Sequence, residues 1–323
     1  MRLLVTGAAG FIGSNFMRMI ASGQIGGISR VVVLDKLTYA GVKANLTKAE
    51  NFSNYSFFEG DICDSNLLAS LLDEVDAVVN FAAESHVDRS ISGAADFVQT
   101  NVVGVQVLLD AIKTSKRKIR FLQVSTDEVY GSIESGSWTE EWPLLPNSPY
   151  SASKASGELL ARSYSRTHGM DVVITRCSNN YGTHHFPEKL IPLFITNLIE
   201  GKKVPVYGTG ENVRDWLHVD DHCRGIYSVL MYGRSGEVYN IGGGRELTNN
   251  EITSLILGAM GADDSSIEYV EDRKGHDLRY SVDWTKINRE LGYEPQVKFE
   301  DGLRDTIQWY RDNEAWWKPL KNR

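Results

Sequence analysis

The 323-residue sequence predicts an α/β protein with a doubly wound parallel sheet. The main observation is that short apolar runs alternate with helix-like stretches through the first half of the chain. These runs cover residues 3–5, 31–34, 55–59, 77–81, 119–124 and 172–176. Alternation at this spacing indicates right-handed crossovers, which place helices on both faces of a parallel sheet. Polar residues follow several of the runs, where ligands of such sheets bind.

The first apolar run leads directly into a glycine cluster, Gly7-x-x-Gly10-x-x-Gly13, and a predicted helix over 12–22. Glycines at such a turn allow a sharp bend, a close approach of the backbone to a pyrophosphate, and tight helix packing. The helix would then point its N-terminal amides at phosphate groups. We therefore expect a Rossmann-type dinucleotide site here.

Asp35 closes the second apolar run, 22 residues beyond Gly13. A carboxylate at this distance accepts hydrogen bonds from the adenine ribose hydroxyls of a dinucleotide. It would repel a 2′-phosphate, so the sequence favours NAD over NADP. The alternative is an exposed Asp that merely ends a strand.

The alternation stops near residue 180, where loops rich in Gly and Pro separate shorter elements. We expect an NAD-binding Rossmann domain over 1–180 and a smaller mixed α/β substrate domain over 181–323. Segments near 213–241 are candidates to return to the first domain. The aromatic tail is expected to serve helix packing, through Trp309, Tyr310, Trp316 and Trp317.

Composition limits the function classes. The formal net charge of −8 argues against nucleic acid as a partner. Cys63, Cys177 and Cys223 are far apart and lack metal-type spacing, so we expect reduced thiols and no metal site. No apolar run reaches membrane-spanning length and no signal peptide precedes the first strand, so a soluble cytoplasmic protein without a membrane partner is expected.

Tyr150 and Lys154 lie one helical turn apart at the start of a predicted helix over 152–165. A tyrosine with a pKa of about 10 is a poor base, but neighbouring positive charge favours the phenolate. Such a Tyr can take a proton from a sugar hydroxyl while a hydride leaves the same carbon. Tyr39 and Lys43 have the same spacing, but they follow Asp35 too closely to reach the nicotinamide end. An exposed Tyr-Lys pair is the alternative.

Thr126-Asp127-Glu128 follows a buried strand. Adjacent carboxylates are costly to desolvate, and clefts contain them mainly where an acid and a base are both needed. The alternative is an exposed acidic loop or helix N-terminus.

The glycine cluster and the Tyr150–Lys154 pair together resemble the extended short-chain dehydrogenase/reductase superfamily. Within it, the chain from residue 2 to about 310 resembles the dTDP-glucose 4,6-dehydratase family. The segments that carry this resemblance are 82–90, 125–131, 178–182, 186–192 and 212–219. The acid pair in 125–131 is the most specific, because the sugar epimerases of the superfamily lack it.

The resemblance implies a lyase of deoxysugar biosynthesis, which converts dTDP-glucose to dTDP-4-keto-6-deoxyglucose. Tyr150 would be the base for oxidation at C4, with Lys154 as its partner and Thr126 bonded to the C4 oxygen. Asp127 would protonate the leaving hydroxyl at C6, and Glu128 would remove the proton at C5. Hydride returns to C6, so NAD is regenerated.

The resemblance also implies the ligand contacts. The expected cofactor residues are Gly7, Gly10, Phe11, Ile12, Gly13, Asp35, Lys36, Leu37, Thr38, Asp61, Ile62, Phe81, Ala82, Ala83, Ser85, Thr100, Tyr150, Lys154 and Asn180. The expected nucleotide-sugar residues are Ser85, Thr126, Asn179, Glu188, Lys189, Pro205, Tyr207, Arg214, Asn249, Arg273 and His276. Arg214 and Arg273 would hold the diphosphate. A homodimer through helices near 90–114 and 150–167 is also implied.

Two departures from the family pattern leave the nucleotide preference open. Thr183-His184-His185 replaces a Pro-containing turn, and Lys274 stands where the family has Pro. Three alternative functions of the chain also remain open: a nucleotide-sugar 4-epimerase, a 4,6-dehydratase of another nucleotide sugar, and a redox-sensing module that binds NAD without turnover.

Overall fold

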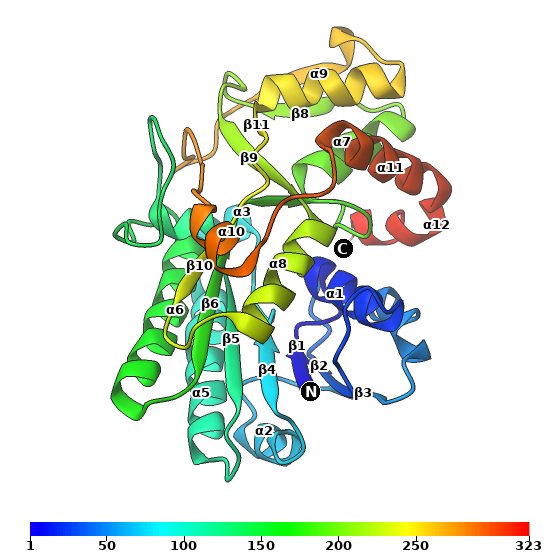
Figure 1. The fold of residues 1–323 in the computed structure, drawn as a ribbon. Helices are drawn as coiled ribbons and strands as arrows, with labels where there is room; N and C mark the ends of the chain where they lie inside the picture. The colour runs from blue at the N-terminus through cyan, green and yellow to red at the C-terminus, as the bar shows by residue number, and fades with distance from the viewer. Residues whose placement is uncertain (323) are drawn as a thin grey trace.

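The computed structural model describes residues 1–322, and its main element is a seven-stranded sheet with all neighbouring strands parallel (Figure 1). The strand order is β10-β6-β5-β4-β1-β2-β3. The strands are β1 (Arg2–Thr6), β2 (Arg30–Asp35), β3 (Tyr55–Glu59), β4 (Ala77–Asn80), β5 (Arg120–Thr126), β6 (Val172–Cys177) and β10 (Val238–Ile241). This architecture confirms the predicted α/β class with a doubly wound Rossmann-type sheet.

Helices cover both faces of the sheet. They are α1 (Phe11–Ala21), α2 (Ser65–Leu72), α3 (Val87–Ser92), α4 (Ala95–Val98), α5 (Val105–Thr114), α6 (Pro149–His168) and α8 (Val219–Tyr232). A π-helical turn, η3 (Gln99–Gly104), joins α4 to α5, and the 3₁₀ turns are η1 (Lys43–Leu46), η2 (Ala49–Asn51) and η4 (Asp127–Tyr130). The observed α1 is within one residue of the predicted helix at each end.

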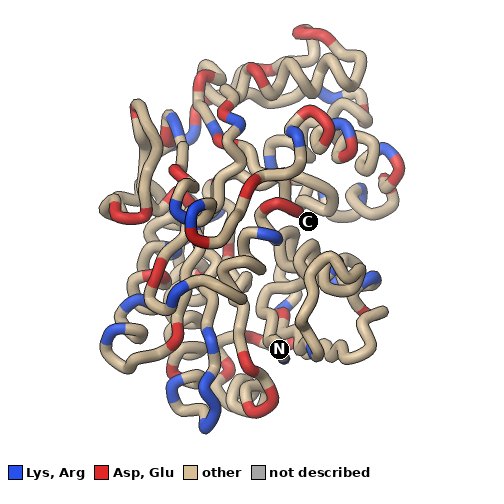
Figure 2. The backbone as a smooth tube through the Cα atoms, in the orientation of Figure 1, with Lys and Arg blue, Asp and Glu red and all other residues tan. Residues whose placement is uncertain are grey.

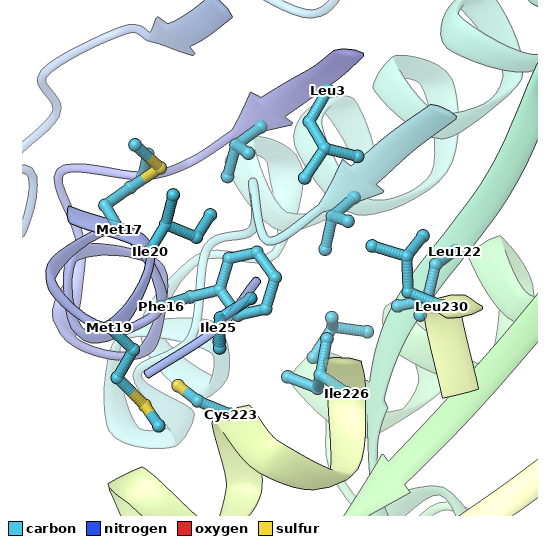
Figure 3. Packing of buried hydrophobic residues seen from close by; sticks show 14 of the residues in the cluster. Leu3, Phe16, Met17, Met19, Ile20, Ile25, Leu122, Cys223, Ile226 and Leu230 are labelled. Atoms are coloured by element: carbon cyan, nitrogen blue, oxygen red, sulfur yellow. The ribbon is translucent and has the colours of Figure 1, made fainter. Parts of the chain in front are cut away.

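The alternation of side chains along β1 separates two hydrophobic cores. Leu3 and Val5 pack with α1 and α8, where Phe16 and Ile226 belong to the same cluster (Figure 3). Leu4 points to the other face, into a cluster formed with α2, α5 and α6. Both faces of every central strand are therefore buried, which explains why these strands read as continuous apolar runs.

The helix that carries Tyr150 is longer than predicted. It starts at Pro149, because Ser148 and Ser151 form a reciprocal capping box and Pro occupies the first turn. It ends before Gly169, which adopts a left-handed conformation with φ of 63°. The start of α6, and with it the position of Tyr150, is thus fixed by local sequence.

Most of the smaller elements of the second half lie at one end of the main sheet, at the top of Figure 1, whereas the helix Thr285–Leu291 packs against α8 and β10. β7 (Asn179–Tyr181), β9 (Val213–His218) and β11 (Glu246–Thr248) form a three-stranded sheet, and β8 (Val204–Tyr207) pairs with β12 (Ile267–Val270). The helices are α7 (Leu190–Ile199), α9 (Asn249–Met260), α10 (Thr285–Leu291), α11 (Phe299–Asp312) and α12 (Glu314–Trp317), with 3₁₀ turns η5 (Asp264–Ser266) and η6 (Leu320–Asn322). A third hydrophobic core lies among β8, α7, α9 and α11.

The segment 213–241 is divided between the two regions. β10 pairs with β6 in the main sheet and α8 packs against α1, whereas β9 lies between β7 and β11. The division of the chain near residue 180 stays a prediction.

Charged residues of both signs are interspersed along the chain (Figure 2). In this view, Lys and Arg form no continuous stripe over the described residues. None of the helices within residues 1–322 combines the length and apolar character needed to cross a membrane.

Glycine is required at two positions of the turn between β1 and α1. Gly7 has φ of +68°, and a Cβ there would lie 2.4 Å from the backbone nitrogen of Ala82. A Cβ on Gly13 would lie 2.6 Å from the Gly7 carbonyl oxygen and 2.8 Å from Cα of Ala8. Since these neighbours are backbone atoms, a side chain could be accommodated only by displacing the turn.

We expect Gly13→Ala to lower the free energy of unfolding by about 1–3 kcal/mol, the usual cost of overpacking. Gly258→Ala is the matched control, because Gly258 lies in α9 and a methyl group there would meet no neighbouring side chain within 4 Å. It should stabilise the protein by about 0.5–1 kcal/mol through helix propensity. Urea unfolding of both variants tests this, and stabilisation by Gly13→Ala would contradict it.

Candidate active site

The carboxyl ends of the parallel strands open into one cavity with a volume of about 300 Å³. Every predicted cofactor residue except Leu37 lines it. Of the predicted nucleotide-sugar residues, Ser85, Thr126, Asn179, Glu188 and Lys189 line it as well. The cavity lies at the switch point of the strand order, where ligands of doubly wound sheets bind.

Leu37 differs because its backbone turns away from the cavity. It has a positive φ of 54°, and its backbone N–H donates to Asp35 Oδ1 at 2.8 Å. Its side chain packs against the core below α1. Its sequence position beside Lys36 and Thr38 gave no indication of this reversal.

Asp35 holds the glycine turn in place. Its Oδ2 accepts the backbone N–H of Ala9 at 2.8 Å, and its carboxylate also lines the cavity. Burial raises the pKa of Asp35, and the hydrogen bonds from Leu37 and Ala9 oppose that rise. Each carboxylate oxygen retains a lone pair, so Asp35 can still accept bonds from ribose hydroxyls.

The residues at this turn fit a dinucleotide. Gly10 caps α1 without a side chain, so the helix amides face the cavity free of a side-chain cap. The glycine cradle leaves space that a Cβ at Gly7 or Gly13 would fill. An acidic strand end completes the arrangement expected for the ribose.

Tyr150, Lys154 and Thr126 meet at the end of β5. Tyr150 is 8% exposed, and burial raises its pKa well above the ordinary value, opposed by a hydrogen bond with Thr126. Lys154 Nζ donates to the carbonyl oxygen of Val124 at 2.7 Å. Burial lowers the pKa of Lys154 to about 8. The alternative of an exposed surface pair is therefore excluded for Tyr150 and Lys154.

Asp127 is a buried carboxyl group among other carboxylates. It is 2% exposed, its Oδ1 accepts a hydrogen bond from Thr126 Oγ1 at 3.2 Å, and its Oδ2 has no partner among the described residues. Burial raises the pKa of Asp127 well above its ordinary value, and the charges of Glu128 and Asp215 raise it further. This environment favours the protonated acid.

Glu128 faces positive charge instead. Burial raises its pKa, but the charges of Arg273, Lys189 and Arg214 oppose this rise. Burial thus raises the pKa of both adjacent carboxyl groups, but the strongest nearby charges are negative for Asp127 and positive for Glu128. The alternative of a solvated acidic loop is wrong for this pair.

A histidine that the sequence did not indicate orients one cavity residue. His222, on α8, is fully buried, and its Nδ1 lies 2.9 Å from Asn180 Oδ1. Asn180 Nδ2 donates to the Ser178 carbonyl oxygen, so the amide is held at both ends. Burial lowers the pKa of His222 to about 3, so the ring is neutral and donates from Nδ1.

The remaining predicted nucleotide-sugar residues do not line this cavity. They are Pro205, Tyr207, Arg214, Asn249, Arg273 and His276. Asp88 on α3 connects two of them, lying 3.7 Å from the Arg273 guanidinium and 3.5 Å from the Tyr207 hydroxyl. Arg214 packs its guanidinium 4.2 Å from the centre of the Tyr280 ring.

Tyr39 and Lys43, which have the same spacing as Tyr150 and Lys154, lie elsewhere in the structure. Tyr39 donates from its hydroxyl to Glu188 at 2.9 Å and lies beneath the Arg89 guanidinium. It therefore connects the loop after Asp35 to the second half of the chain.

Several lining residues were not among the predicted cofactor and nucleotide-sugar residues, namely Asn45, Glu84, Cys177, Ser178, His184, His185, Phe186 and Trp316. Trp316 was expected only to pack between helices. It does contact Trp309, with ring centres 5.0 Å apart, but it also donates to Asn45 Oδ1 and faces the cavity. The departure at 183–185 was the only signal for the histidines. Within residues 1–322, no cluster of His, Cys, Asp and Glu is arranged to hold a metal ion.

The fold and this site define an extended short-chain dehydrogenase/reductase, and the family model described as GDP-mannose 4,6 dehydratase matches residues 4–306. A dTDP-glucose 4,6-dehydratase from Streptomyces niveus is 58% identical over 325 residues, covering 100% of this chain and 96% of the relative. One from Actinoplanes sp. is 57% identical, covering 98% and 100%. The chain belongs to the dTDP-glucose 4,6-dehydratase family, as its motifs predict.

Comparison with solved structures supports the same family. The dTDP-glucose 4,6-dehydratase DesIV from Streptomyces venezuelae, solved with NAD and TYD bound, has a TM-score of 0.97 and 60% identity, covering 99% of this chain and 100% of that one. A UDP-glucuronic acid 4-epimerase from Bacillus cereus has a TM-score of 0.89 but only 30% identity, covering 97% and 99%. The higher identity favours the dehydratase over the 4-epimerase alternative.

The raised pKa of Asp127 predicts a pH-dependent stability. Because the native carboxyl group ionises above its ordinary pKa of 3.8, the folded protein retains a proton that the unfolded chain releases. The contribution of Asp127 to stability therefore falls as pH rises above that value. Asparagine cannot ionise, so Asp127→Asn should raise the melting temperature relative to wild type more at pH 8 than at pH 4.

Glu134→Gln is the control, because Glu134 is an exposed carboxylate in the loop after η4. Its melting temperature should follow that of wild type at both pH values. A stabilisation by Asp127→Asn that is larger at pH 4 would contradict the assigned protonation.

Proposed function

We propose that this chain catalyses the dehydration of dTDP-glucose to dTDP-4-keto-6-deoxyglucose with a bound NAD. When bound, NAD supplies the oxidation at C4 and the later reduction at C6 by accepting and returning one hydride. The observation that carries the proposal is the contrast between Asp127, buried near carboxylates, and Glu128, near three cations. An epimerase, or a protein that only senses NAD, has no need for this contrast.

Tyr150 would remove the proton from the C4 hydroxyl, with Thr126 bonded to the same oxygen. Burial raises the pKa of Tyr150 in the protein alone, and the positive charge of a bound nicotinamide would lower it. Lys154 Nζ is held by its hydrogen bond to the Val124 carbonyl oxygen, and it places a polar group beside the cavity at the end of β5. Oxidation at C4 acidifies the neighbouring C5 proton.

Glu128 would remove that C5 proton, since Arg273, Lys189 and Arg214 favour its ionised form. Asp127 would give its proton to the C6 hydroxyl, which leaves as water. A carboxyl group kept neutral by burial is suited to this step, and an ionised one to the other. Two adjacent residues thus supply an acid and a base at the same strand end.

The cationic side chains would also receive the nucleotide sugar. Arg273 has a buried Nε without a hydrogen-bond partner in the described structure, which suits an anionic ligand. Lys189 Nζ donates to the Ser85 carbonyl oxygen beside the cavity. Pro205, Tyr207, Arg214, Asn249 and His276 remain proposed contacts of the same ligand.

A substrate deuterated at C4 tests the reaction. We expect product with deuterium at C6 and solvent hydrogen at C5, without added cofactor, measured by NMR. Tyr150→Phe should slow this transfer by about 10²–10⁴-fold, the usual value of a general base. Tyr39→Phe is the matched control and should lose much less. Deuterium returned to C4 with inverted configuration would indicate an epimerase instead.

A leaving-group experiment separates the two carboxylates. Fluoride at C6 needs less protonation to depart than hydroxide, so a 6-fluoro substrate should restore activity to Asp127→Asn far more than to Glu128→Gln. Glu128→Gln lacks the C5 base, which a better leaving group cannot replace. Release of fluoride measures both variants, and the opposite pattern would reverse the two roles.

We also propose a cytoplasmic homodimer that forms through the helices around 90–114, which are α3, α4 and α5, and through α6. These neighbouring helices expose apolar side chains, with Ile91 38%, Val98 48% and Leu159 53% exposed. Light scattering should give about twice the 36.1 kDa chain mass. Leu159→Lys should shift the mass toward one chain, and a monomeric wild type would contradict the proposal.

A further inference from the structure

The segment Thr183–Phe186 crosses from the second half of the chain to the first turn of α1. His185 stacks on Phe11 with ring centres 4.1 Å apart and an angle of 11° between the planes. Phe11 is the first residue of α1, directly after Gly10. Both residues line the cavity. The imidazole therefore lies over the helix turn whose amides face a dinucleotide pyrophosphate.

The backbone around His185 is held from two sides. The Tyr310 hydroxyl donates to the His185 backbone oxygen. The next residue, Phe186, packs edge-on against Tyr39 with ring centres 5.5 Å apart. These contacts hold the segment in place, and the stacking on Phe11 orients the ring, which favours a preorganised site.

The two ring nitrogens of His185 have different surroundings. Nδ1 is buried and has no hydrogen-bond partner among the described residues. Burial and the charge of Lys189 lower the pKa of His185 well below its ordinary value, so the ring is neutral and carries one proton. A buried N–H without an acceptor is rarer and costlier than an unused lone pair. The proton therefore belongs on Nε2, the other ring nitrogen of this cavity-lining residue.

We propose that His185 donates a hydrogen bond from Nε2 to the pyrophosphate of the bound dinucleotide. This inference rests on the proposed use of NAD and adds a residue from the second half of the chain to its site. The pyrophosphate accepts hydrogen bonds only, which matches a neutral donor. It would bind at the α1 turn, where Phe11 and His185 stack and both line the cavity.

His184, the adjacent histidine, has a different environment. Its Nδ1 lies 3.0 Å from Thr183 Oγ1, and its ring packs against Trp309 with centres 4.3 Å apart. The His184 backbone adopts a left-handed conformation, with φ of +64°. The donor role is therefore assigned to His185 alone.

Binding to the full-length protein tests the proposal with NAD, ADP-ribose and adenosine as probes. His185→Phe keeps a ring on Phe11 but removes the donor. Because a hydrogen bond to a charged group contributes about 1.5–3 kcal/mol, its loss should weaken NAD and ADP-ribose about 10- to 100-fold. Adenosine has no phosphate, so its affinity should change less than about twofold. His185→Gln retains an N–H donor and should recover most of the loss.

His168→Phe is the control for a histidine ring replaced on the surface, since His168 lies at the exposed end of α6 against Tyr164. It should bind all three probes as wild type does. Equal weakening of adenosine and NAD by His185→Phe would overturn the proposal, because it would indicate a general change in the cavity. Unchanged binding of NAD would overturn it too.

The tautomer provides a readout that does not depend on a variant. In wild-type protein labelled with ¹⁵N-histidine, the His185 signals, assigned by their loss in His185→Gln, should show a protonated Nε2. A proton on Nδ1 would refute the assignment. A wild-type protein that binds no NAD would instead refute the proposed function, whereas normal turnover with wild-type affinity in His185→Phe would refute this inference alone.

Discussion

The parallel pairing of β1 with both β2 and β4 is the constraint on which the rest of the structure depends. Because all strands run in one direction, their polar carboxyl ends lie at one edge. The crossover from β1 to β2 through α1 and the crossover from β3 to β4 through α2 cover opposite faces of the sheet, which opens a crevice at that edge. A ladder of buried side chains supports it: Thr6 donates to Asn80, and Asn80 donates to Gln123 at 2.8 Å. These bonds satisfy polar groups that would otherwise be costly inside the sheet.

Burial then decides the protonation states along this edge. It raises the pKa of the Tyr150 hydroxyl and of both adjacent carboxyl groups, and it lowers the pKa of Lys154 to about 8. The differences among these groups come from their charged neighbours. Asp127 is near carboxylates, whereas Glu128 is near three cations from the second half of the chain. Two carboxyl groups that are adjacent in sequence can therefore have nearby charges of opposite sign.

The two halves of the chain close the cavity together. Tyr39 donates to Glu188, Trp316 donates to Asn45, and His185 stacks on Phe11. In each pair one residue belongs to the glycine turn or the loop after β2, and the other comes from beyond residue 180. Residues from distant parts of the sequence thus surround the dinucleotide site. Segments expected to bind the nucleotide sugar contact segments expected to bind the cofactor.

The sequence by itself determined the features that depend on local spacing. Apolar runs predicted the sheet, the glycine spacing predicted the phosphate turn, and the Tyr150–Lys154 and Asp127–Glu128 motifs predicted the family. Only the tertiary structure decided which residues line the cavity. Leu37, which has a positive φ, does not line the cavity. His185 and Trp316 line it, and His222 lies behind it, in contact with Asn180. The physical reason is that periodicity and turn preference act over a few residues. Burial, protonation and stacking depend instead on groups that are far apart in the chain and meet only when it folds.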